Sequence, residues 1–106
     1  MNVQFKKGVL ELCVLIVIAE KDYYGYELAE IISEQIQIAD GSLYPLLRRL
    51  TLQNYLTTYH AVSSKGPSRK YYKMTEEGKD YLDKLLNEWN QFADTIAGFV
   101  KRRNDK

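Results

Sequence analysis

The last third of the chain carries a helical pattern whose apolar side is too long for a domain of this size to cover. Its apolar residues alternate three and four apart, as in a coiled coil: Leu82, Leu85, Trp89, Phe92, Ile96 and Phe99, with Leu86, Ala93 and Val100 beside them. A helix over 75–103, capped by Thr75, would be about 40 Å long. A domain of about 100 residues has a radius of gyration of about 13 Å. The far end therefore projects from the body.

We call eight of these residues the apolar seam and predict that they form a dimer interface: Leu82, Leu85, Leu86, Trp89, Phe92, Ile96, Phe99 and Val100. No other predicted helix is left to cover them, and exposing them would leave a large apolar patch in water. A symmetric homodimer through this helix is the economical arrangement. The alternative is that the helix folds back on the first helix, which would cover Leu82 and Leu85 but not the whole seam.

Three shorter helices are predicted before it. Residues 5–20 are apolar nearly all round, which indicates a largely buried helix. Residues 24–35 are amphipathic. A third helix starts near Ser42, because Pro45 is tolerated only in a first turn, and it turns Leu43, Leu46, Leu47 and Leu50 inward. Two amphipathic helices joined by a short turn that contains glycine are typical of a helix-turn-helix.

The outward side of the third helix carries hydroxyl and guanidinium groups and no acid: Ser42, Tyr44, Pro45, Arg48 and Arg49. Such groups bind phosphates and base edges in DNA. A solvated surface helix with two ordinary arginines is the alternative.

A β-hairpin is predicted next, with strands at 55–62 and 69–74 and a turn at Gly66 and Pro67. Alternation places Tyr72 and Met74 on one face. The hairpin is basic, with Lys65, Arg69 and Lys70 at the tip and Lys73 beyond them. Three helices followed by such a hairpin predict a mainly α fold, a winged helix-turn-helix over 1–74, continued by a dimerisation helix over 75–106.

The charge distribution supports this interpretation although the net charge is only +1. Residues 41–75 contain no Asp or Glu and carry a charge of +6, whereas the remainder carries −5. The basic segment coincides with the third helix and the hairpin, and such asymmetry can mark a face that binds a polyanion. A chance solvated patch is the alternative when charge is considered alone.

Nothing in the sequence predicts catalysis, a cofactor or a metal site. The single cysteine, Cys13, cannot form an intrachain disulfide, which suits the cytoplasm, and it is interpreted as a small buried apolar residue. His60 has no cysteine or second histidine at metal-ligand spacing, so a pairing or packing role is expected. The apolar run over 9–19 is too short for a membrane span, which needs about 20 residues.

The sequence resembles the PadR family of bacterial transcriptional regulators over residues 5–99. The matching segments are YGYEL at 24–28, GSLYPLLRRL at 41–50, GPSRKYY at 66–72 and TEEG at 75–78. The resemblance implies a winged-helix dimer that represses transcription and is released by a small molecule. It also implies DNA contacts by Ser42, Tyr44, Pro45, Arg48 or Arg49, and by Lys65, Arg69 and Lys70 in the hairpin.

The single C-terminal helix resembles the small, multidrug-responsive subfamily. In that subfamily a tryptophan on the last helix lines a flat aromatic pocket between subunits, which implies a planar aromatic effector bound by Trp89, Phe92, Ala93 and Ile96. The alternative is that Trp89 only packs in the dimer seam.

The resulting hypothesis is a dimeric regulator that binds a palindromic operator in double-stranded DNA. The competing hypothesis is a protein-interaction module on the same scaffold, without sequence-specific DNA binding.

Overall fold

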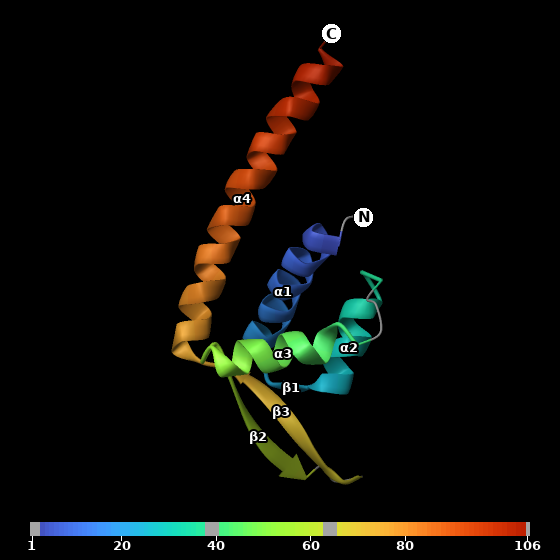
Figure 1. Ribbon diagram of the computed structural model, residues 1–106, viewed down its shortest axis with the longest axis vertical. Helices are drawn as coiled ribbons and strands as arrows, with labels where there is room; N and C mark the ends of the chain where they lie inside the picture. The colour runs from blue at the N-terminus through green and yellow to red at the C-terminus, as the bar shows by residue number, and fades with distance from the viewer. Residues whose placement is uncertain (1–2, 38–40, 63–65, 106) are drawn as a thin grey trace.

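The computed structural model describes residues 3–37, 41–62 and 66–105, with side chains from Gly8 onward (Figure 1). The helices are α1 (Val3–Glu20), α2 (Gly25–Ser33), α3 (Leu43–Leu52) and α4 (Glu76–Asn104). The strands are β1 (Tyr23–Tyr24), β2 (Leu56–Val62) and β3 (Ser68–Met74). The order of elements agrees with the mainly α chain and small hairpin predicted from the sequence. None of the described helices is both long and apolar enough to cross a membrane.

The sheet is antiparallel with the order β1-β3-β2. The hairpin pairs Leu56 with Met74 at its base and Val62 with Ser68 near its tip. Strand β1 was not predicted from the sequence, in which no strand was expected before the second helix. Tyr23 and Tyr24 pair with Tyr72 and Tyr71. A two-residue strand is too short to show an alternating pattern, so only its pairing with β3 defines it.

The core lies where α1, α2 and α3 meet one face of the sheet and the first turns of α4. Fully buried side chains come from the first three helices and the sheet, including Val14 and Leu15 of α1, Leu28 of α2, Leu47 and Leu50 of α3, and Leu56 of β2. Tyr72 and Met74 are buried on the inner face of β3, which confirms the predicted alternation. The first helix is largely buried, as expected, although Cys13 is only half-buried.

Two residues with positive φ mark the ends of α3. Gly41 precedes the helix at φ 80°, a conformation that glycine adopts at no steric cost. Asn54 follows it at φ 67°. The Tyr55 amide donates to the Leu50 carbonyl and the Asn54 amide to the Thr51 carbonyl, the Schellman pattern that closes a helix with a left-handed residue. This closure directs the chain into β2 and fixes the hairpin relative to α3.

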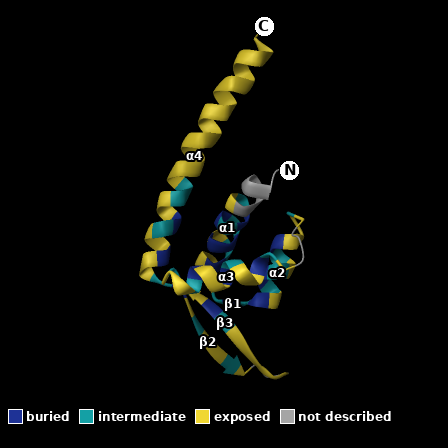
Figure 2. Cartoon of the chain, in the orientation of Figure 1, coloured by how far each residue is buried: buried dark blue, intermediate teal, exposed yellow. Residues whose placement is uncertain are grey.

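Helix α4 starts on the body and then leaves it (Figure 1). The Thr75 hydroxyl accepts a 2.9 Å hydrogen bond from the Gly78 amide, so the predicted cap is confirmed. A Cβ at Gly78 would lie 2.1 Å from the Tyr55 carbonyl oxygen, which makes this glycine necessary for seating the helix. Leu82 is buried and Leu85 and Leu86 are half-buried, whereas every residue over 87–105 is exposed (Figure 2). The molecule therefore extends 60 × 28 × 21 Å.

Candidate nucleic-acid interface

Helix α3 separates apolar and polar side chains as the sequence predicts. Leu43, Leu47 and Leu50 are buried. Tyr44, Pro45, Arg48 and Arg49 are exposed, and Ser42 is partly exposed just before the helix. Ser42 does not cap α3 through its side chain. The structure therefore places four of the five predicted residues on the surface of α3 and the fifth, Ser42, directly before its first turn.

The two arginines of α3 have different surroundings. Arg49 lies 3.3 Å from the Glu11 carboxylate of α1 and donates a 3.0 Å hydrogen bond to Gln53. Arg48 has no ion pair with any residue in the described part of the chain. The Arg48 charge is therefore available to a polyanion, whereas the Arg49 charge is partly neutralised from within the body. The outward side of α3 carries no acid of its own, but Glu11 reaches its C-terminal end.

Glu11 also joins α3 to the base of α4. The Tyr81 hydroxyl donates a 2.7 Å hydrogen bond to the Glu11 carboxylate. Burial, with this hydrogen bond, raises the pKa of Tyr81 to about 12. The Tyr81 ring stacks on Tyr55, with centroids 4.0 Å apart and planes within 2°. These contacts hold the end of α3, the start of the hairpin and the start of α4 in one arrangement.

Tyr44 of α3 lies against the start of α2. A Cβ at Gly25 would lie 2.6 Å from Cε1 of Tyr44, so the ring lies directly against that glycine. Burial raises the pKa of Tyr72, and the nearby Tyr44 hydroxyl adds to the increase. The Lys70 ammonium lies 5.7 Å from the centroid of the Tyr72 ring. The Tyr44 ring is thus held against the start of α2, and one of the predicted hairpin cations lies over the Tyr72 ring.

The hairpin cations occupy both faces of β3. Arg69, Lys70 and Lys73 are all exposed. Lys70 is on the same side of the strand as Tyr72, whereas Arg69 and Lys73 alternate to the side of Tyr71. The predicted contact Lys65 lies outside the described residues.

A row of tyrosines crosses the outer face of the sheet, which the sequence analysis missed. Tyr71 of β3 stacks on Tyr59 of β2 at 5.5 Å and meets Tyr24 of β1 edge-on at 5.6 Å. The Arg69 guanidinium lies 5.1 Å from the centroid of the Tyr24 ring. The Tyr59 hydroxyl donates a 2.5 Å hydrogen bond to Asp22, which raises the pKa of Tyr59 to about 12. In the sequence, the aromatic pair at 23–24 was the one indication of strand β1, because aromatic residues favour strands.

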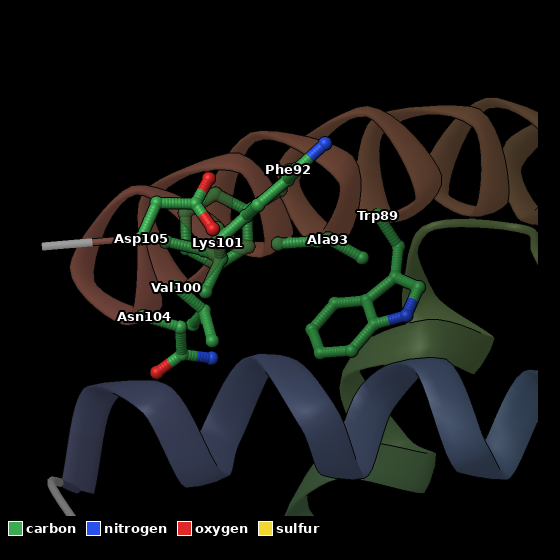
Figure 3. A pocket seen from close by; sticks show the side chains of 9 residues that line it. Trp89, Phe92, Ala93, Val100, Lys101, Asn104 and Asp105 are labelled. Atoms are coloured by element: carbon green, nitrogen blue, oxygen red, sulfur yellow. The ribbon is translucent and has the colours of Figure 1, made fainter.

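A second candidate region lies on α4. An open hollow of about 920 Å³ is lined by the four predicted ligand residues, Trp89, Phe92, Ala93 and Ile96, together with Ala97, Val100, Lys101, Asn104 and Asp105 (Figure 3). A smaller hollow of about 300 Å³ adjoins it between α1 and α4, and Trp89 and Phe92 line both. Figure 3 shows the Trp89 ring directed from α4 towards α1.

The described residues hold no group of three or more His, Cys, Asp or Glu side chains that could bind a metal ion. His60 is exposed in β2, opposite Lys70. Burial raises the pKa of the Cys13 thiol, which disfavours the reactive thiolate.

The chain matches the model of the "Transcriptional regulator PadR-like family" over residues 14–84. It is 36% identical over 99 residues to an uncharacterised protein of Lysinibacillus sphaericus, covering 90% of this chain and 91% of that protein.

Solved structures of similar proteins match nearly the whole chain. A transcriptional regulator from Streptococcus has a TM-score of 0.86 at 33% identity, with 92% of this chain and 98% of the other covered. A PadR-like transcriptional regulator from Bacillus cereus has a TM-score of 0.84 at 34% identity, covering 92% and 96%. These similarities confirm the predicted winged helix-turn-helix with a long C-terminal helix.

Proposed function

The chain belongs to the PadR-like family of transcriptional regulators, and from that premise we propose that it is a homodimeric repressor that binds a palindromic operator and is released by a planar aromatic effector. The family consists of DNA-binding regulators and not of enzymes. Such a regulator acts in the cytoplasm. The observation that carries the proposal is the acid-free outward side of α3 beside the hairpin cations.

The proposed DNA contacts divide into two groups. Tyr44, Pro45 and Arg48 lie on α3 and Ser42 directly precedes it, so all four would enter the major groove with the start of this helix. Arg69, Lys70 and Lys73 lie on β3, where they would contact backbone phosphates, as would Lys65. Arg49 is proposed as a weaker contact because Glu11 already pairs with it at 3.3 Å.

The exposed part of the apolar seam supports the dimer. Phe99 is 62% exposed, Val100 53% and Phe92 50%, in a row along the projecting part of α4. A contiguous apolar stripe of this kind on a single helix marks an interaction surface. A second copy of α4 presents the same stripe, so a two-fold arrangement would cover both at once. The alternative, in which α4 folds back on α1, would cover only the start of the seam. Within one chain Leu82 is buried and Leu85 is half-buried, whereas the seam residues on the projecting part of α4 are exposed.

The hollow on α4 supports an effector site between two such helices. Its lining is mainly apolar and aromatic, and the Trp89 and Phe92 rings lie 6.3 Å apart at 49°. Flat aromatic molecules stack on such rings. Release of DNA would then follow if the effector favoured a spacing of the two α3 helices that does not match the half-sites.

The test is fluorescence anisotropy with a duplex from the region upstream of the protein's own coding sequence, alongside a scrambled duplex of equal length. We expect binding to the first that is at least about 1,000-fold tighter than to the second. Addition of a planar aromatic cation should release the protein from the upstream duplex. Equal binding to both duplexes, or none, would favour the protein-interaction module instead.

A further inference from the structure

The dipeptide Tyr24-Gly25 touches both elements of the proposed DNA interface. Tyr24 is the last residue of β1 and Gly25 is the first residue of α2. The Tyr24 ring lies under Arg69 of the hairpin, and Gly25 lies against the Tyr44 ring of α3. We propose that these two adjacent residues are positioning residues that fix where Arg69 and Tyr44 meet DNA. The proposal rests on the proposed function.

Tyr24 contacts an exposed arginine of the hairpin. Arg69 is exposed on β3, and an arginine side chain in that situation is free to occupy many rotamers. Its guanidinium lies 5.1 Å from the Tyr24 ring centroid, within the range of a cation–π contact. Tyr24 pairs with Tyr71, and Arg69 lies two residues before Tyr71 on the same face of β3, diagonal to Tyr24. The contact therefore follows from the register of the sheet.

The Tyr24 ring is itself held in place. It meets Tyr71 edge-on, and Tyr71 stacks on Tyr59. The Tyr59 hydroxyl in turn donates a hydrogen bond to Asp22. The Tyr24 amide donates a 3.1 Å hydrogen bond to the Glu27 carboxylate in the first turn of α2. The ring is thus a fixed surface on which the Arg69 charge is ordered before DNA arrives. Ordering a side chain in advance lowers the entropy that binding must overcome.

Gly25 leaves the space that the Tyr44 ring occupies. Gly25 is buried, and any Cβ there would meet two ring carbons and the hydroxyl oxygen of Tyr44 at 2.6–3.1 Å. Tyr44 is 55% exposed, so its ring has room to move outward. An alanine at 25 would therefore displace the Tyr44 ring and leave the backbone in place. The missing side chain of Gly25 sets the position of a side chain proposed to contact DNA.

Two double-mutant cycles on the full chain test the proposal, with anisotropy on the upstream duplex as the readout. Tyr24→Leu should weaken binding about two- to fivefold, the strength of an exposed cation–π contact. Tyr24→Phe keeps the ring and should bind like the wild type. In an Arg69→Ala background, Tyr24→Leu should cause no further loss, because the two effects are not independent.

The second cycle pairs Gly25→Ala with Tyr44→Ala. Gly25→Ala alone should weaken binding to a degree similar to Tyr44→Ala, and the double variant should bind no worse than Tyr44→Ala. Melting temperatures of all variants check that the fold is kept. If Gly25→Ala unfolds the protein, restoration of the fold by Tyr44→Ala supports the proposed contact, and failure to restore it overturns that half.

An NMR measurement on the free protein separates the two possible failures. The Arg69 Nε–H group should be more ordered in the wild type and in Tyr24→Phe than in Tyr24→Leu. Suppose that the wild type binds its upstream duplex but that Tyr24→Leu lowers the DNA affinity by the same factor in the presence and in the absence of Arg69. In that case the positioning role is wrong and the proposed function stands. If the wild type shows no specific binding, the proposed function fails and the positioning role fails with it, whatever the NMR shows.

Discussion

The carboxylate of Glu11 in α1 lies 3.3 Å from the guanidinium of Arg49 in α3 and accepts a hydrogen bond from Tyr81 of α4. One acid from the first helix thus restrains an arginine of α3, the helix proposed to enter the major groove, and the base of α4. Three elements that are far apart in the chain converge on this carboxylate.

Glu11→Gln should tighten DNA binding. The substitution removes the charge that pairs with Arg49 but keeps an oxygen that accepts from Tyr81. Arg49 then becomes available to a phosphate, so the slope of log K against log salt should steepen by about 0.9. Glu20→Gln changes the same charge at an exposed position of α1 and is the control. Weaker binding by Glu11→Gln would show that the ion pair places Arg49 for DNA and does not withhold it.

Arg48→Ala should weaken DNA binding more than Arg49→Ala. Arg48 has no ion pair in the described part of the chain, whereas Arg49 is partly neutralised by Glu11. Loss of Arg48 should also lower the salt slope by about 1 if it contacts a phosphate. Lys84→Ala, at an exposed position of α4, removes a charge away from the interface and should have no effect. Unchanged DNA affinity in the variant that lacks both arginines would show that α3 is not the helix that enters the major groove.

Stability should depend on Tyr81 at high pH. Its pKa is about 12 in the folded chain and about 10 when unfolded, so the protonated form is favoured by folding. The contribution is complete below pH 10 and is lost as the pH rises towards 12. The stability difference between the wild type and Tyr81→Phe, measured by urea unfolding, should therefore shrink over that range. A constant difference would show that the Tyr81 hydroxyl is not held as the structure has it.

Phe92→Glu should convert the proposed dimer to a monomer. Phe92 is half-exposed in the seam, and a carboxylate there would have to be buried against a second copy. Sedimentation should show half the mass, and operator affinity should fall about 100-fold or more as the second half-site is lost. Asn87→Glu lies on the other side of α4 and is the matched control. A dimer that survives Phe92→Glu would place the interface elsewhere.

Trp89→Ala should weaken the binding of planar aromatic compounds by about tenfold or more, since stacking and burial are both lost. Trp89 is the single tryptophan, so its fluorescence reports wild-type binding directly. Calorimetry compares the variants, with Trp89→Phe expected to retain part of the affinity. Equal affinity in Trp89→Ala would leave Trp89 as a packing residue of the seam.

The elements that the sequence predicted well are those specified by neighbours in the chain. The α3 stripe of leucines, the Thr75 cap and the alternation of Tyr72 and Met74 all depend on residues within a few positions. The contacts that it missed join distant positions. Tyr81 and Glu11 are 70 residues apart, and Tyr59 and Asp22 are 37 apart. No local sequence pattern predicts such pairs. Arg48 and Arg49 therefore looked equivalent in the sequence, whereas in the structure Arg49 pairs with Glu11.

The most direct test of the central claim is a salt titration of binding to the upstream duplex and to a scrambled one. We expect tight binding to the upstream duplex only, with two copies of the chain bound per site. Log K should fall linearly with log salt, by about 0.9 for each phosphate contacted. Binding that does not distinguish the two duplexes, or that is insensitive to salt, would contradict the proposal that α3 and the hairpin form a sequence-specific DNA interface.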